Sequence, residues 1–182
     1  MLAYAGEDFG LPPIGTPLTA GSIATETAPN TTQQQAFEVV RPFTANSNAP
    51  YVVVNKTHKD SQPVPKGLGP NGGRLQSHHG LQQEWAANNI PRYDPKLAPT
   101  ITIETGKGFP HTTLTNLQKI RRDARVAAGL GKWSSSVNDE LGFIVSDFRQ
   151  AGFGDNVIKK VLEQNYKMLD TLGVKYMKPA GF

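Results

Sequence analysis

The chain has 182 residues and a mass of 19.7 kDa, which suits one ordinary domain with an extended appendage or two small domains. It contains no cysteine, which excludes disulfides, iron–sulfur clusters, zinc ribbons and thiol nucleophiles. No apolar run approaches the ~20 residues that a membrane-spanning helix needs, so we expect no membrane span.

Charge is distributed unevenly along the chain. Residues 1–55 contain four acidic residues and one basic residue, a net charge of −3, whereas residues 56–182 have a net charge of +7. A basic region of this kind favours a polyanionic partner such as nucleic acid. A solvated surface with an ordinary excess of positive charge would give the same count.

The N-terminal part of the chain is predicted to be a leader or docking arm. Residues 1–35 are rich in Pro, Gly, Thr, Ala and Ser and show the periodicity of neither a strand nor a helix. Two short segments at 37–41 and 51–55 are β-branched and aromatic and therefore predict strands, and Pro42 places the first at a sheet edge. Residues 1–60 together form this predicted arm.

Residues 61–182 are predicted to form the folded domain. The Pro/Gly-rich residues 60–73 predict a mobile loop or the domain boundary. Beyond them the pattern predicts a short helix, an alternating strand and three longer helices, at about 81–89, 99–104, 112–128, 134–151 and 155–173. Because strands are few and helices dominate, the predicted fold class is α+β.

Three of the four histidines flank one helix–strand–turn unit. His78 and His79 are adjacent, and His111 lies just before or within the first turn of the helix that follows the strand. Imidazole is a natural ligand for Zn, Ni, Mn or Fe and titrates near neutral pH. Adjacent residues of an extended segment point to opposite sides, which suits one imidazole on a metal and the other free to take a proton from water. A chance His-His in a surface loop with a helix-capping histidine is the structural alternative.

The sequence around these histidines is similar to a known family. The run LQSHHGLQQEWA at 75–86, PTITI at 99–103 and PHTTLTNLQ at 110–118 resemble, in this order, the SHH group of bacterial polymorphic-toxin nucleases. This group belongs to the HNH / endonuclease VII superfamily. The resemblance covers about residues 71–128 and implies a ββα-metal nuclease core, which a helical extension at 134–175 and a loop-rich N-terminal region would accompany.

The resemblance also implies a role for each motif residue. By position, His78 and His111 would be ligands of one divalent metal ion (Mg, Mn, Zn or Ni), and His79 would be the general base that activates water for attack on a phosphodiester. Asn116 is the candidate for a further ligand on the helix, with Thr115 as a weaker choice. The chain lacks the second helix histidine of the His-x-x-x-His pattern in nuclease colicins, which leaves the ligand count and the metal preference open.

Basic residues near the motif are candidates for binding the nucleic-acid backbone. Arg74 lies four residues before His78, and Arg121 and Arg125 share a helix face because they are spaced i, i+4. A helix made soluble by its arginines is the alternative interpretation.

Four other residues are predicted to be structural. Trp85 is expected in the core, and Glu84 and Glu104 are expected to be solvated at a helix and a strand end. His58, far from the other histidines in the sequence, is predicted to be a solvated loop residue.

The function that the resemblance implies is that of a secreted antibacterial toxin, a metal-dependent endonuclease with DNA as the expected substrate. A ribonuclease on the same fold and a non-enzymatic basic DNA-binding protein are the alternatives. The implied partners are a cognate immunity protein and a secretion or delivery machinery. The implied localisation is export from the producing bacterium, followed by action in the cytoplasm of the target cell.

Overall fold

The computed structural model describes residues 50–64 and 66–182, together with the backbone of residues 37–39. Residues 1–35 of the predicted arm lie outside these described residues. Within the described part of the chain, no helix is both long and apolar enough to cross a membrane.

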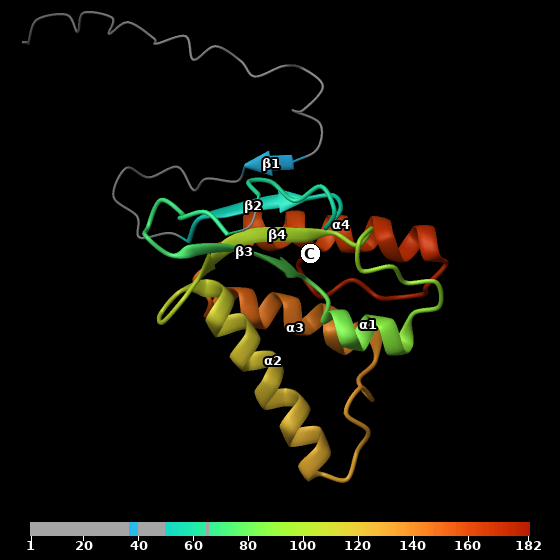
Figure 1. The fold of residues 1–182 in the computed structure, drawn as a ribbon. Coiled ribbons are helices and arrows are strands. Elements are labelled where there is room, and N and C mark those ends of the chain that lie inside the picture. Colours follow the sequence, from blue (N-terminus) through green and yellow to red (C-terminus); the bar gives the residue numbers. More distant parts are fainter. Residues whose placement is uncertain (1–36, 40–49, 65) are drawn as a thin grey trace, which may run out of the picture.

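A four-stranded antiparallel sheet lies at the centre of the fold, in the order β1-β2-β4-β3 (Figure 1). Its strands are β1 (Phe37–Val39), β2 (Val52–Asn55), β3 (Arg74–His79) and β4 (Thr100–Thr105). β1 and β3 are the edge strands, so the edge position predicted for the first segment is confirmed. β3, which carries the histidine pair, is the strand that the family resemblance implies.

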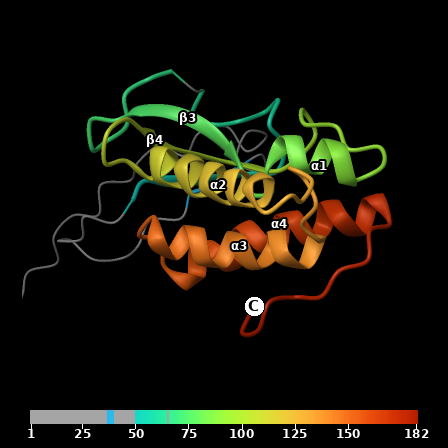
Figure 2. The same ribbon diagram turned by 90° about the horizontal axis from the view of Figure 1, so that it is seen from below.

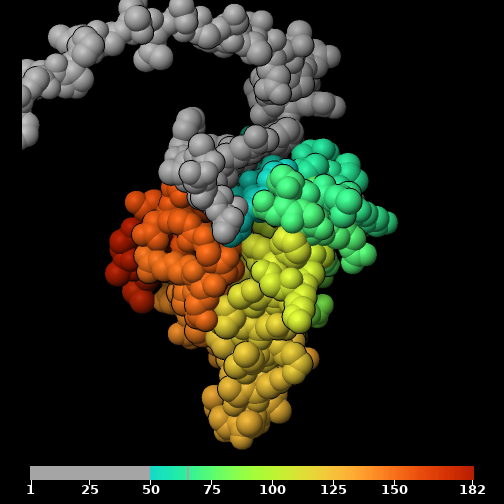
Figure 3. Space-filling model, turned by 90° about the vertical axis from the view of Figure 1, so that its left-hand side faces the viewer, coloured from blue at the N-terminus to red at the C-terminus, as the bar shows by residue number. Residues whose placement is uncertain are grey.

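Four helices complete the predicted α+β fold, which is confirmed. They are α1 (Gln83–Asn89), α2 (Pro110–Ala127), α3 (Val137–Gln150) and α4 (Asp155–Leu172). Local signals set their ends: Pro110 begins α2, a capping box of Ser136 and Asp139 begins α3, and Gly173 ends α4 in the left-handed conformation (φ 70°). The C-terminal half of α2 projects away from the body of the domain (Figures 1 and 3).

The hydrophobic core lies between one face of the sheet and the helices (Figures 1 and 2). Val54 of β2 and Ile101 and Ile103 of β4 pack there with Leu114 of α2. Trp85 of α1 is 1% exposed, so its predicted place in the core is confirmed. Strands β2 and β4 and the helix α2 therefore share one core, and β3, which pairs with β4, completes the ββα unit with β2 as one additional strand.

The opposite face of the sheet is mainly polar and hydrogen-bonded, with the apolar side chains of Val53 and Leu75 also buried on it. Asn55 Nδ2 donates to Thr102 Oγ1 at 3.0 Å, and Ser61 Oγ lies 3.1 Å from Ser77 Oγ and 3.0 Å from Thr100 Oγ1. We call this side of β2, β3 and β4 the polar face. Because its hydroxyl and amide groups pair with one another, it can be buried without an apolar layer.

Residues 66–73 pack against the sheet and do not separate two domains. Glu104 of β4 is 1% exposed and accepts hydrogen bonds from the backbone N–H groups of Asn71 (2.8 Å) and Gly73 (3.2 Å) and from the Asn71 side chain (2.8 Å). The prediction that Glu104 is solvated is therefore wrong. A buried carboxylate is stable here because the loop supplies the donors that water would otherwise provide.

The predicted domain boundary at residue 60 lies after β2, a strand of the sheet. All four residues Val52–Asn55 are buried, and β2 pairs with β4 along its whole length. A boundary at residue 60 would remove a strand from the interior of the sheet. The folded domain therefore begins upstream of β2.

Removing residues 1–60 is expected to prevent cooperative folding, because it deletes β2 and leaves Ile101, Ile103 and Thr102 of β4 without their partners. Removing residues 1–35 keeps both β1 and β2 and is expected to leave a cooperative transition. Urea titrations followed by circular dichroism check both outcomes. A cooperative, stable chain of residues 61–182 would contradict the position of this boundary.

Candidate active site

The strand register places the two adjacent histidines on opposite faces of β3. His78 pairs with Ile101, whose side chain lies in the core, and His79 pairs with Thr100 of the polar face. Residues paired directly across antiparallel strands share a face. The prediction that the two imidazoles point to opposite sides is therefore confirmed.

His78 contacts His111 in the first turn of α2. Their ring centres are 5.1 Å apart and their planes are nearly perpendicular, at 85°. Nε2 of Gln118 lies 3.4 Å from Nε2 of His78, and Oγ1 of Thr115 lies 3.5 Å from Nδ1 of His111. These three residues of α2 occupy positions i, i+4 and i+7, so they share the helix face that meets β3.

Burial keeps the imidazole of His78 neutral. His78 is 7% exposed, and burial, with smaller effects of His111 and His79, lowers its pKa to about 3. Burial also lowers the pKa of His111, and a hydrogen bond with the Ser77 backbone opposes that shift. A neutral imidazole keeps a nitrogen lone pair, which is the form that binds a metal ion.

The spacing of these two ring centres is of the size that two imidazoles on one divalent ion would have. An imidazole nitrogen lies about 2.1 Å from zinc, so two rings at a tetrahedral angle have their centres about 5.2 Å apart. The observed 5.1 Å between His78 and His111 agrees with that value. Among the residues that the structure describes, no three His, Cys, Asp or Glu side chains are grouped to hold a metal. The cluster thus offers two imidazole ligands, with Thr115 and Gln118 as neighbouring neutral polar groups.

The structure does not bring Asn116 into this cluster. Asn116 is exposed on α2. Since each helical residue advances by about 100°, a residue five positions after His111 is rotated about 140° away from it. Besides His111, the α2 residue that reaches His78 is Gln118. Its seven-residue spacing from His111 is the sequence signal that identifies it.

His79 lies on the polar face with a defined hydrogen bond. Its Nε2 donates to the main-chain carbonyl of Pro95 at 3.0 Å, because a carbonyl can only accept, and Nδ1 therefore carries the lone pair. Burial lowers the pKa of His79, the bond to Pro95 raises it, and the neighbouring His58 lowers it. His79 is thus a neutral imidazole whose Nδ1 is the acceptor nitrogen.

The imidazole of His58 packs against that of His79, with ring centres 4.7 Å apart. The prediction that His58 is a solvated loop residue is wrong, since the residue is half-buried in this contact. The contact joins residues 21 positions apart that belong to no common helix or strand. No periodicity in the sequence could reveal it.

The outer side of β3 faces away from the rest of the sheet. Leu75 exchanges backbone hydrogen bonds of 2.7 and 2.9 Å with the preceding loop on the outer side of the strand. Alternate residues of a strand direct their N–H and C=O groups to the same side, so those of Ser77 and His79 also point outward.

The structure places the guanidinium groups of Arg121 and Arg125, the predicted phosphate-binding pair, against α3. Arg121 forms a two-pronged ion pair with Asp147 of α3, whose side chain is 4% exposed, and Nη2 of Arg125 lies 3.3 Å from Oε1 of Glu140. The two guanidinium groups also lie 4.2 and 5.5 Å from the ring centre of Phe143. They share a face as predicted, but that face packs against α3.

Arg74 is the remaining member of the predicted phosphate-binding set. Its side chain is exposed at the start of β3, at the other end of the strand from His79. Lys107, in the turn between β4 and α2, is exposed as well. These two cations are available to an external ligand.

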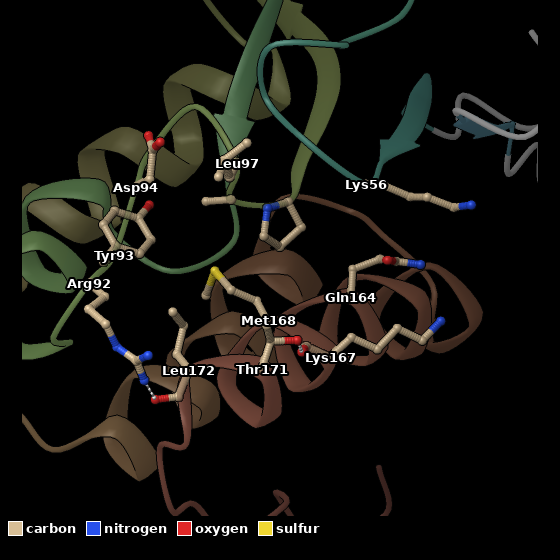
Figure 4. Close-up of a pocket in the computed structure, with 12 residues that line it drawn as sticks. Lys56, Arg92, Tyr93, Asp94, Leu97, Gln164, Lys167, Met168, Thr171 and Leu172 are labelled. Atoms are coloured by element: carbon tan, nitrogen blue, oxygen red, sulfur yellow. Dashed lines mark hydrogen bonds between the residues drawn. The ribbon is translucent and has the colours of Figure 1, made fainter.

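A separate cavity of about 260 Å³ lies between α4 and the loop that supplies Pro95 (Figure 4). Leu97 from the loop and Met168 from α4 form apolar parts of its wall. Three cationic side chains also line it, those of Lys56, Arg92 and Lys167. No histidine lines this cavity, so it is distinct from the histidine clusters.

Arg121→Ala is expected to destabilise the protein by about 3 kcal/mol, because it leaves the Asp147 carboxylate buried without its partner. Lys119→Ala breaks an exposed pair with Asp123 on the same helix and is expected to change stability little. Urea unfolding of both variants checks the difference. Equal free energies of unfolding for the two variants would show that the Arg121–Asp147 ion pair does not stabilise the fold.

The lowered pKa of His78 predicts that acid destabilises the metal-free protein. Between pH 6.5 and about 3 the unfolded chain binds a proton at His78 that the folded protein does not. Stability therefore falls by up to about 1.4 kcal/mol per pH unit as the pH drops below 6.5. Urea titrations in EDTA between pH 7.5 and 5 test this, with His78→Asn expected to show a shallower slope. Identical slopes for the two proteins would refute the assignment to His78.

Comparison with protein families agrees with this geometry. A model of the Tox-SHH family, an HNH/Endo VII superfamily toxin with a SHH signature, matches residues 72–170. No curated protein and no solved structure matches the chain. The matched region begins just before β3 and ends within α4, so it is longer than the predicted resemblance at 71–128. His58 lies before the matched region. The chain belongs to the Tox-SHH family of HNH/Endo VII superfamily toxins.

Proposed function

We propose that the chain is a metal-dependent endonuclease that hydrolyses phosphodiester bonds, with DNA as its substrate. The observation that carries this proposal is the placement of three neutral imidazoles around one edge strand. His78 and His111 lie together on one side of β3, and His79, with Nδ1 as its acceptor nitrogen, lies on the other. Membership of a nuclease-toxin superfamily supports it.

In this proposal His78 and His111 hold one divalent ion, which would be Mg, Mn, Zn or Ni. When bound, the ion supplies Lewis-acid stabilisation of negative charge on the phosphate and on the leaving oxygen. Two protein ligands leave coordination positions open for water and substrate, as in other catalytic sites. Thr115 and Gln118 are neighbouring groups that can hydrogen-bond to such water.

His79 acts as the general base. Its Nδ1 accepts a proton from water, the water oxygen forms a bond to phosphorus, and the bond from phosphorus to the leaving oxygen breaks. The leaving oxygen takes up a proton from solvent. The hydrogen bond from Nε2 to Pro95 fixes the tautomer and stabilises the imidazolium that forms. General-base catalysis of this kind contributes about 10²–10⁴-fold.

The basic surface supports a nucleic-acid substrate. Residues 56–182 have a net charge of +7, and Arg74 and Lys107 are exposed close to the two elements that carry the histidines. Lys and Arg at such positions bind phosphates without reading sequence. A ribonuclease with the same site and a non-enzymatic DNA-binding protein are the alternatives that the following experiment separates.

The purified chain is expected to cleave supercoiled plasmid when a divalent metal is present and to lose this activity in EDTA. Plasmid and an RNA of matched sequence are incubated with Mg, Mn, Zn or Ni and resolved on gels. Cleavage of RNA alone would replace the DNA assignment. A shifted but uncut plasmid with every metal would support the binding protein and refute the enzyme.

Two variants separate proton transfer from metal binding. His79→Ala is expected to lower cleavage by at least about 100-fold and to keep the metal affinity measured by calorimetry, because His79 lies on the face away from the ligands. His111→Ala serves as the matched variant and is expected to lose metal affinity and activity together. Loss of metal affinity in His79→Ala would reverse these two assignments.

We further propose a cognate immunity protein, with an acidic surface where it covers the basic one. A nuclease of this kind would also damage the cell that makes it, so the producing cell needs such an inhibitor. The family's toxin description supports export through a secretion or delivery machinery and action in the cytoplasm of a target cell. Co-expression of the wild-type chain with its genetic neighbours, scored by survival of the host, tests for the inhibitor.

A further inference from the structure

The contact between His58 and His79 brings a residue from outside the matched family region to the proposed base. His58 follows β2, and the family match begins only at residue 72. The ring centres are 4.7 Å apart and the ring planes are nearly perpendicular, at 88°. Both side chains are half-buried. A fourth histidine therefore belongs to the surroundings of the active site.

The turn that carries His58 is held in place on both sides. The backbone N–H of His58 donates to the carbonyl of Ala98 at 2.9 Å, and its carbonyl accepts a hydrogen bond from the Ser61 hydroxyl at 2.8 Å. The same hydroxyl lies 3.0 Å from Oγ1 of Thr100, the residue paired with His79. His58 is thus fixed to the strand and the loop that surround His79.

We propose that His58 is a positioning residue of the active site, whose ring holds the His79 imidazole in the orientation set by Pro95. This inference rests on the proposed function of His79 as the general base. The His79 ring is attached through two rotatable bonds, and among the described residues its side chain forms one hydrogen bond, to Pro95, about which it can tilt. A perpendicular ring packed against it restricts that tilt. Misplacing a reacting group by about 1 Å costs about 100-fold in rate, so the restraint affects catalysis directly.

The same geometry argues against His58 as the acid that protonates the leaving oxygen. In an in-line displacement the attacking and leaving oxygens lie on opposite sides of phosphorus. The acid and the base must then face each other across the phosphate. Ring centres 4.7 Å apart leave no space for a phosphate between His58 and His79. His58 therefore acts through His79.

The test compares three variants of the full-length chain on a labelled DNA duplex. His58→Ala is expected to lower kcat about 10–100-fold while KM and metal affinity stay unchanged, because His78 and His111 lie on the other face. His58→Phe keeps a ring in the same place and is expected to recover most of kcat. Lys59→Ala, an exposed residue of the same turn, is expected to cleave like the wild type. Wild-type kcat in His58→Ala would overturn the proposal.

A double-variant cycle separates positioning from a general structural effect. When His79 is already alanine, adding His58→Ala is expected to change the residual rate less than about twofold, since no base remains to be positioned. Equal losses in both backgrounds would overturn the proposal. So would calorimetry showing two ions per wild-type chain and one in His58→Ala, because His58 and His79 would then form a second metal site.

Long-range proton–nitrogen spectra of the imidazoles provide a readout that does not need cleavage. The wild type is expected to show His79 as a single Nε2–H tautomer, and His58→Ala to show a mixture of tautomers. If the wild type cuts no nucleic acid but the tautomer changes, the proposed function fails and the positioning contact stands. An unchanged tautomer together with an unchanged rate in His58→Ala would overturn the positioning role.

Discussion

The pairing register between β3 and β4 determines where every group of the site lies. Because side chains alternate across a strand, a slip of one residue would move His78 to the polar face and His79 into the core. Ile101 and Ile103 hold β4 in register from the core side, and the hydrogen-bonded hydroxyls of Ser77 and Thr100 hold it from the other. The sheet therefore keeps the two imidazoles on opposite faces, although they are neighbours in the chain.

A second constraint fixes α2, which brings His111 to β3. Arg121 and Arg125 bind buried carboxylates of α3, and their stripe on α2 lies next to the one that carries His111 and Gln118. Rotation of α2 about its axis would break both ion pairs. Buried ion pairs often add little net stability, but they reject alternative packings, because any other arrangement leaves a charge without a partner. The arginines thus serve the site from a distance, by setting the rotation of the helix.

Local signals in the sequence predict most of the fold but only part of the candidate site. Caps, prolines and periodicity place the four helices and β4, and the alternation of side chains separates His78 from His79. The errors share one cause, since they concern contacts between distant segments. The carboxylates that bind Arg121 and Arg125 come from α3. The N–H groups that pair with the buried Glu104 carboxylate come from a loop. His58 lies beside His79 because its backbone N–H bonds to the carbonyl of Ala98. Helical spacing shows which residues share a face, but tertiary packing decides what that face meets.

The acceptor that orients His79 is a main-chain carbonyl, that of Pro95. Every amino acid carries such a carbonyl, so no exchange of a side chain at this position deletes the hydrogen-bond acceptor itself. The ring of His58 belongs to a side chain, so a single amino-acid substitution at this position removes the contact. Mutations that remove activity but keep the fold would therefore affect the contact with the His58 ring more often than the hydrogen bond to the Pro95 carbonyl. Spontaneous variants that escape the toxicity of their own product would be found at position 58 far more readily than at position 95.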